Sequence, residues 1–358
     1  MKEFSVKFRT DILDLNARVI PNHRHGQFKV ELAGQDTEPV ILTQLVNGDW
    51  EITERGTNDL SDQELKGLGH AIDLKIKEIY QIKNILVTTD FSDASINAAK
   101  YAAALSNQLR INNLALYHSY AALDIPSTPY APVPWQYDEH PEESLEKTRK
   151  IKKELENIIS THTIIEIYND ESPLIAAVDE MGVKLNIGLV ITSTTGKNNL
   201  ERILVGSNTL SLAKHCKVPL LMVPPQITFK PIKQIVFACD LKNISESTPI
   251  YAIRTFVNAI GAKLLILNVD QDETHFNPDR IKEMTALHQL WDREEPEYHY
   301  IDDENTAHGI VMFAEKYQAD LIVTVPKVYG FFESIFHSSI TKKLTYTTHL
   351  PLLLFKDD

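Results

Sequence analysis

The fold is decided by the stretch Ile82-Lys-Asn-Ile-Leu-Val-Thr-Thr-Asp90, which returns 150 residues later (240 − 90) as Ile232-Lys-Gln-Ile-Val-Phe-Ala-Cys-Asp240. Each stretch is a short apolar run that ends in aspartate. Continuous runs of this kind are typical of strands that are buried on both faces of a parallel sheet. A motif that recurs at this distance predicts two copies of one structural unit.

Two later pairs of segments support the repeat. Ile187–Thr192 corresponds to Ala319–Thr324, and Lys217–Met222 corresponds to His349–Leu354. The prolines of the last pair, Pro219 and Pro351, are 132 positions apart (351 − 219), which is 18 fewer than the opening aspartates. We therefore expect a longer loop after the second strand of the first copy. Ile125–Pro141, which contains five prolines, is the candidate for this extended segment.

Strands and helices alternate throughout the first copy. The expected strands are 85–89, 114–118, 163–168, 189–192 and 220–223, and the expected helices are 94–109, 142–159, 174–181 and 207–215. This order predicts an open, doubly wound parallel sheet of five strands. The repeat predicts a second such sheet in tandem.

The first 80 residues follow a different pattern. Period-two alternation predicts strands at 4–8, 27–32, 39–43 and 50–53, and Asn47-Gly48 is typical of a hairpin turn. Ser61, followed three residues later by Glu64, predicts a capped helix that runs to Glu78. We expect a small antiparallel sheet with one helix, and hence domains at 1–80, 81–226 and 227–358.

Composition limits the function classes. The chain has 36 basic and 49 acidic residues, a net charge of −13, which disfavours nucleic acid and anionic membranes as partners. Its two cysteines, Cys216 and Cys239, have no CxxC spacing, and no signal-peptide pattern is present. We expect a cytoplasmic protein. The His23-Arg-His25 run has no third ligand, so no metal site is predicted.

The expected binding site lies at the carboxyl ends of the first copy's strands, where ligands bind in open parallel sheets. Thr89-Asp90 and His118-Ser119 end two strands, and the run Thr192–Ser207 follows the fourth. Small residues around Gly196 allow backbone N–H groups to approach an anion. Gly206-Ser207 opens the next helix, whose positive end also favours an anion. We expect His118 to be a buried core histidine.

The spacing Ser193-x2-Gly196-x9-Gly206-Ser207, with Asp90 upstream, resembles the Gly-x2-Gly-x9-Gly-(Ser/Thr) motif of the universal stress protein family. The resemblance covers Ile82–Val223 and, more weakly, Ile232–Phe355. It implies an adenine-nucleotide α-hydrolase-like fold that binds ATP, with or without Mg²⁺, or ADP or AMP.

The same resemblance assigns the site residues. Asp90 would hold the adenosine moiety, Ser119 would lie beside the base, and Ser193, Gly196, Gly206 and Ser207 would surround the phosphates. The first glycine of the family's motif is Ser193 here.

The second copy departs further from the motif. Its equivalent positions are Val325, Val328, Ser338 and Ser339. We expect a degenerate site, and a second copy that packs against the first as an intramolecular pseudo-dimer. The sequence does not decide whether the whole chain also forms a homodimer.

Three functions are compatible with the sequence. The first is a nucleotide-binding stress or signalling module, for which no catalytic residue is predicted and whose activity is at most slow ATP hydrolysis. The alternative is a protein-interaction scaffold that binds no nucleotide and recruits an unknown protein partner through residues 1–80. The third is an enzyme that acts on a nucleotide-like substrate, for which no catalytic residue can be nominated.

Overall fold

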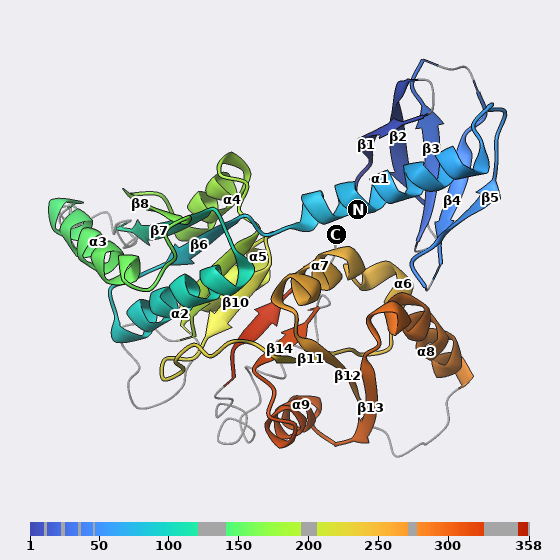
Figure 1. Cartoon of the computed structure of the whole chain (residues 1–358). Helices are drawn as coiled ribbons and strands as arrows, with labels where there is room; N and C mark the ends of the chain where they lie inside the picture. The colour runs from blue at the N-terminus through green and yellow to red at the C-terminus, as the bar shows by residue number, and fades with distance from the viewer. Residues whose placement is uncertain are drawn as a thin grey trace, which may run out of the picture.

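The computed structural model describes residues 1–10, 13–22, 26–34, 37–45, 47–120, 141–194, 206–270, 278–325 and 350–356. It contains a small antiparallel sheet and a large, mainly parallel sheet, drawn in Figure 1. The predicted α/β class with an antiparallel sheet at the N-terminus is confirmed. The two five-stranded parallel sheets that the sequence predicted are instead the two halves of one ten-stranded sheet. Within the described ranges, every helix is too short or too polar to cross a membrane.

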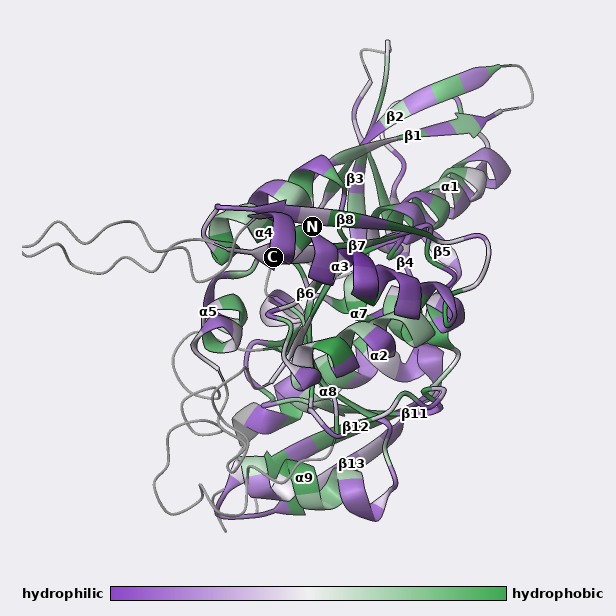
Figure 2. Ribbon diagram, turned by 90° about the vertical axis from the view of Figure 1, so that its left-hand side faces the viewer, coloured by the Kyte–Doolittle hydropathy of each residue, from purple (hydrophilic) through white to green (hydrophobic). Residues whose placement is uncertain are grey.

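The small sheet is an antiparallel meander with one helix packed on it. Its strands follow one another in the order β1 (Phe4–Arg9), β2 (Asp14–Pro21), β3 (Gln27–Leu32), β4 (Val40–Gln44) and β5 (Trp50–Glu54), and α1 (Asp62–Tyr80) lies across one face. Strand β2 was not predicted. Its hydrophobic and hydrophilic residues alternate (Figure 2), but Asp14 and Pro21 at its ends obscured the pattern in the sequence.

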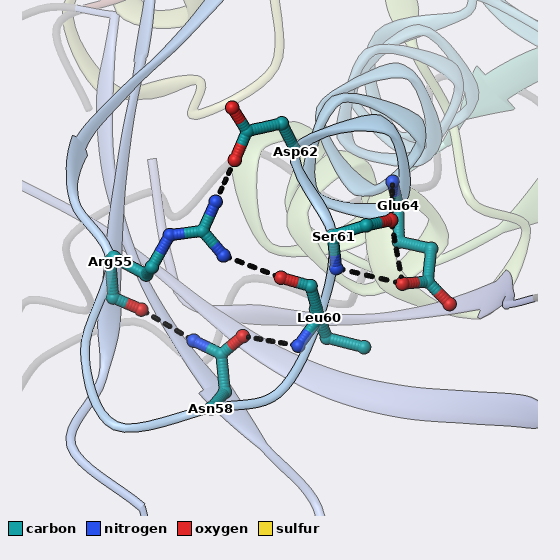
Figure 3. Close-up of polar contacts among 6 residues, drawn as sticks. All are labelled: Arg55, Asn58, Leu60, Ser61, Asp62 and Glu64. Carbon is teal, nitrogen blue, oxygen red and sulfur yellow. Dashed lines mark hydrogen bonds and ion pairs between the residues drawn. The ribbon is translucent and has the colours of Figure 1, made fainter.

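Helix α1 begins at the predicted cap. The backbone N–H of Glu64 donates to Ser61 Oγ over 3.3 Å, and Ser61 N donates to Glu64 Oε2 over 2.8 Å. Figure 3 shows this reciprocal pair beside an ion pair between Arg55 and Asp62. Two of the backbone donors at the start of the helix are thereby satisfied, which fixes where α1 begins.

The large sheet has ten strands in the order β13-β12-β11-β14-β15-β10-β9-β6-β7-β8. Its first half contains β6 (Asn84–Thr88), β7 (Asn113–Ser119), β8 (Ile164–Asp170), β9 (Leu189–Ser193) and β10 (Leu220–Val223). Its second half contains β11 (Gln234–Ala238), β12 (Lys263–Asp270), β13 (Glu297–Asp302), β14 (Leu321–Thr324) and β15 (Leu352–Leu354). Within each half, the strands are parallel and share the order 3-2-1-4-5.

The strand registers locate the extra residues of the first half. Ile85 pairs with Leu189, and Ile235 pairs with Leu321. The offset between the halves is therefore 150 at the first strand (235 − 85) and 132 at the fourth (321 − 189). The segment between the second strand and the next helix has 21 residues in the first half (120–140) and 7 in the second (271–277), which accounts for 14 of the 18 extra residues (21 − 7). The prolines from Pro126 to Pro134 lie in this first segment, outside the described residues.

Helices cover both faces of the large sheet. One continuous hydrophobic core spans both halves under α2 (Asp93–Leu109), α3 (Pro141–Glu156), α7 (Ile250–Ile260) and α8 (Pro278–Trp291). On the opposite face, α4 (Leu174–Lys184) and α5 (Ser207–His215) cover the first half, while α9 (Thr306–Lys316) covers the second. Two short elements, α6 (Ile244–Ser247) and η1 (Asp292–Glu294), flank α7 and α8.

The two halves meet along their last strands. Strands β10 and β15 pair antiparallel, with Leu220 opposite Leu354 and Leu221 opposite Leu353. The edge strand β10 of the first half and the edge strand β15 of the second half are thus paired with each other. Gln108 of α2 adds a polar link: its side-chain amide donates to Ile232 O over 2.8 Å and accepts from Ile232 N over 2.9 Å.

The small sheet contacts the second half through α7. Tyr251, near the start of α7, stacks on Tyr80 with ring centroids 6.4 Å apart and lies 6.2 Å from Phe28. Figure 1 shows α7 beneath α1. The first 80 residues are therefore packed against the second half, although in sequence they precede the first.

Candidate functional site

The candidate site is the carboxyl edge of the first half. Strands β9, β6 and β7 are direct neighbours and run parallel, so their carboxyl ends meet at one edge. Asp90 follows β6, Ser119 ends β7 and Ser193 ends β9. The topology therefore brings these three predicted residues to the same edge. The sheet reverses its strand order between β6 and β9, which is where open α/β sheets bind their ligands.

Asp90 shapes the turn between β6 and α2. Its Oδ1 accepts hydrogen bonds from Ser92 N over 3.1 Å and from Ser92 Oγ over 2.5 Å. Phe91, between them, adopts a left-handed backbone with a φ of 63°. A bulky residue rarely takes this conformation, and such strain clusters at ligand sites. One oxygen of Asp90 is thus committed to the turn.

His118 and Ser119 are held by the neighbouring strands. His118 is 6% exposed, and its Nδ1 lies 2.7 Å from Thr89 O. Since a carbonyl oxygen only accepts, Nδ1 carries the proton. The expectation of a buried core histidine agrees with these contacts. The Ser119 hydroxyl donates to Ser172 O over 2.7 Å, which orients it toward β8.

The two ends of the candidate phosphate loop are tied together. Gly206 N donates to Thr194 O over 2.9 Å, and Thr209 Oγ1 donates to Ser193 O over 2.8 Å. These bonds place the start of α5 beside the end of β9. Thr194 Oγ1 is buried, and among the described residues it has no hydrogen-bond partner.

Helix α5 begins without a side-chain cap in the part of the chain that the structure describes. Gly206 is the N-cap residue, with φ −63° and ψ 151°, and no side chain accepts from the first turn. By contrast, Ser61 caps α1 and Ser92 caps α2. The first backbone N–H groups of α5, starting at Ser207, have no intrahelical acceptor and present a positive end to an anion.

Some of the predicted residues lie outside the part of the chain that the structure describes. Gly196 lies outside the described residues, as do Val328, Ser338 and Ser339 of the second half and the His23-Arg-His25 run. Among the residues that are described, no group of three or more His, Cys, Asp or Glu side chains is arranged to hold a metal ion.

The second half repeats the strand-end geometry with different side chains. Asp240 Oδ1 accepts a hydrogen bond from Lys242 N over 3.2 Å. Leu241, with a φ of 51°, has a left-handed backbone like that of Phe91. Asn268 replaces His118 (268 − 118 = 150) and donates to Cys239 O over 2.9 Å. The aspartate therefore serves the same turn in both halves.

An ion pair lies at the carboxyl edge of the second half, at a position where the first half carries a tyrosine. The Arg280 guanidinium donates to both carboxylate oxygens of Asp270, over 2.8 Å to Oδ1. The residue equivalent to Asp270 in the first half is Tyr120 (270 − 150). The two edges thus carry different charges at this position.

The sequence did not indicate the role of Phe91. Its ring centroid lies 4.1 Å from that of the His118 ring, and Lys147 of α3 lies over the Phe91 ring, with Nζ 5.6 Å from the centroid. This stack brings a cation to the candidate site from a helix that follows the long loop. The apolar Phe91 between Asp90 and Ser92 gave no signal, because its left-handed backbone depends on tertiary contacts.

The strand order and the helix that opens at Gly206 define a doubly wound α/β domain of the class that binds ligands at the carboxyl edge of its sheet. The model of the universal stress protein family matches residues 81–224. This part of the chain belongs to the universal stress protein family.

Known proteins agree with this assignment. The universal stress protein MJ0531 of Methanocaldococcus jannaschii is 29% identical over 150 residues, which span 39% of this chain and 81% of that protein. The crystal structure of a universal stress protein from Archaeoglobus fulgidus matches with a TM-score of 0.56 at 16% identity, over 77% of this chain and 99% of its own. That likeness concerns the fold alone, and it extends well beyond residues 81–224.

A universal stress protein that was solved in complex with cAMP also matches. It is 19% identical over 40% of this chain and 98% of its own, with a TM-score of 0.30. At that level, its ligand carries no weight for the site of this chain.

Proposed function

We propose that residues 81–226 bind an adenine nucleotide, ATP, ADP or AMP, at the carboxyl edge of β6, β7 and β9, and that the chain acts as a stress or signalling module. The start of α5 at Gly206 carries the proposal. Among the described residues no side chain caps it, and its first N–H groups favour an anionic partner and lie at the end of the predicted phosphate loop. Asp90 would contact the adenosine moiety and Ser119 the base. Ser193, Gly196, Gly206 and Ser207 would surround the phosphates.

The anchors of the loop support a phosphate site. Thr194 Oγ1 is a buried hydroxyl with no partner among the described residues, and it lies next to the backbone bond that joins Thr194 to Gly206. Burying a hydroxyl without a partner is unfavourable. A phosphate oxygen bound at the start of α5 would supply the acceptor.

The second repeat, residues 227–358, completes the proposal as an intramolecular dimerisation partner. Its strand β15 pairs with β10, and one core runs through both halves. With Val325 at the end of β14 and the Asp270–Arg280 pair at the strand ends, we expect it to bind no nucleotide.

Titration calorimetry with ATP and ADP, each with and without Mg²⁺, tests this function. Gly206→Leu should weaken binding at least tenfold, because the added side chain stands where the phosphate would approach. The backbone at Gly206 is of a kind that any residue adopts, so the substitution tests contact and not strain. Gly67→Leu is the matched control, since the space around Gly67 on α1 is open.

No binding by the unmodified chain at millimolar nucleotide would contradict the proposal. That outcome would favour the alternative, a scaffold that recruits a protein partner without nucleotide.

A further inference from the structure

The end of the second half crosses onto the first half. Strand β15 pairs with β10, and Leu354 is fully buried in the hydrophobic core that α5 covers, together with Leu212 and Ala213. Figure 1 shows α5 beside β10, at the seam between the halves. Helix α5 therefore rests on a strand of the other copy as well as on its own.

Lys356, two residues beyond β15, reaches the far end of α5. Its Nζ donates to the carbonyl oxygen of Ala213, in the last turn of the helix. The last four carbonyls of a helix have no intrahelical donor, so this bond satisfies an orphan acceptor. A positively charged ammonium group at this end also interacts favourably with the negative pole of the helix dipole. Burial lowers the pKa of Lys356, which agrees with an amine that is held partly away from water.

The two ends of α5 are thus fixed by different halves of the chain. At the start, Thr209 Oγ1 donates to Ser193 O over 2.8 Å, and Gly206 N donates to Thr194 O over 2.9 Å, both within the first half. At the end, Lys356 of the second half holds Ala213. The residue that corresponds to Lys356 in the first half is Pro224 (356 − 132), which has no amine to offer. The first half therefore has no amine at the position equivalent to Lys356.

We propose that Lys356 is a positioning residue for the nucleotide site of the first half. It holds the C-terminal end of α5 in place, so that the N–H groups after Gly206, at the other end, point toward the bound phosphate. This inference rests on the proposed nucleotide binding. It assigns to the second half a role in the first half's site, although the two lie in different repeats.

Three variants of the full chain test whether Lys356 holds α5 in place. Lys356→Met removes the charge and the donor but keeps an unbranched stem, and Lys356→Arg restores both. Lys214→Met is the matched control, because Lys214 lies on α5 itself but is exposed. For each variant, hydrogen exchange of residues 207–215 reports the order of α5, and calorimetry reports the affinity for ADP. Far-UV circular dichroism verifies that each variant is folded.

We expect Lys356→Met to speed exchange in α5 and to weaken ADP binding roughly three- to tenfold, the range that the loss of one hydrogen bond to a helix carbonyl supports. Lys214 shares the charge effect at this end of the helix but does not make the bond to Ala213. Lys356→Arg and Lys214→Met should both match the unmodified chain.

Two results would overturn the inference. One is a Lys356→Met variant that behaves as Lys214→Met does, and the other is one that exchanges faster but binds ADP unchanged. If the unmodified chain binds no ADP, the proposed function fails, whereas the exchange experiment still decides whether Lys356 orders α5.

Discussion

Gln108 links the two halves of the large sheet, and replacing it with alanine should loosen that link. Its Nε2 donates to Ile232 O over 2.8 Å and to Ile260 O over 3.2 Å, and its Oε1 accepts from Ile232 N over 2.9 Å. Ile232 is 1% exposed, so water cannot fully replace these bonds. A neutral hydrogen bond contributes about 1 kcal/mol, and a buried group left without a partner costs about 1–3 kcal/mol. We therefore expect Gln108→Ala to lower the free energy of unfolding by about 2–4 kcal/mol.

Urea denaturation followed by far-UV circular dichroism measures this loss. Lys100→Ala is the matched control on the same helix, because its ion pair with Glu154 joins two half-exposed side chains over 2.9 Å. Such surface pairs contribute about 0–1 kcal/mol. If Gln108→Ala loses less than about 0.5 kcal/mol, or no more than Lys100→Ala, this amide does not join the halves.

Two further predictions concern the core of the first 80 residues and its contact with α7. Gly69→Ala should destabilise their core by about 1–3 kcal/mol in thermal denaturation, because the new Cβ would lie 2.3 Å from the Trp50 ring; Gly67→Ala, in open space, should be neutral or stabilising, and equal behaviour of the two would count against close packing. Burial raises the pKa of Tyr251 to about 12. The unfolded chain therefore loses this phenolic proton near pH 10 before the folded chain does, and stability falls as the pH rises from 10 to 12, by about 1.4 kcal/mol at pH 11. Tyr251→Phe should lack that part of the loss, and parallel pH curves for the two proteins would contradict it.

Much of the fold could be predicted from local patterns. The buried strands that end in Asp90 and Asp240 repeat almost residue for residue, and the Ser61–Glu64 pair marks the start of α1. These features depend on neighbours in the chain, so the sequence alone is enough to find them. Strand β2 was missed because charged and proline residues at its ends outweighed its alternation.

The joining of the halves depends on distant contacts that local patterns do not contain. An apolar run such as Leu352–Leu354 predicts a strand but not its partner, so the antiparallel pairing with β10 could not be predicted from the sequence. The bond from Lys356 to Ala213 and the left-handed backbone of Phe91 likewise exist only after distant segments have packed together. The candidate site could be located from the strand ends, whereas the contacts that hold it could not.

The number of nucleotides bound per chain decides whether the first half alone binds nucleotide. Native mass spectrometry of the full chain with saturating ATP or ADP counts them, and the Gly206→Leu variant identifies the half that holds them. We expect one nucleotide per chain, and a lower bound fraction in the variant, because its binding is weaker. No bound nucleotide, or two per chain with one retained in Gly206→Leu, would contradict this expectation.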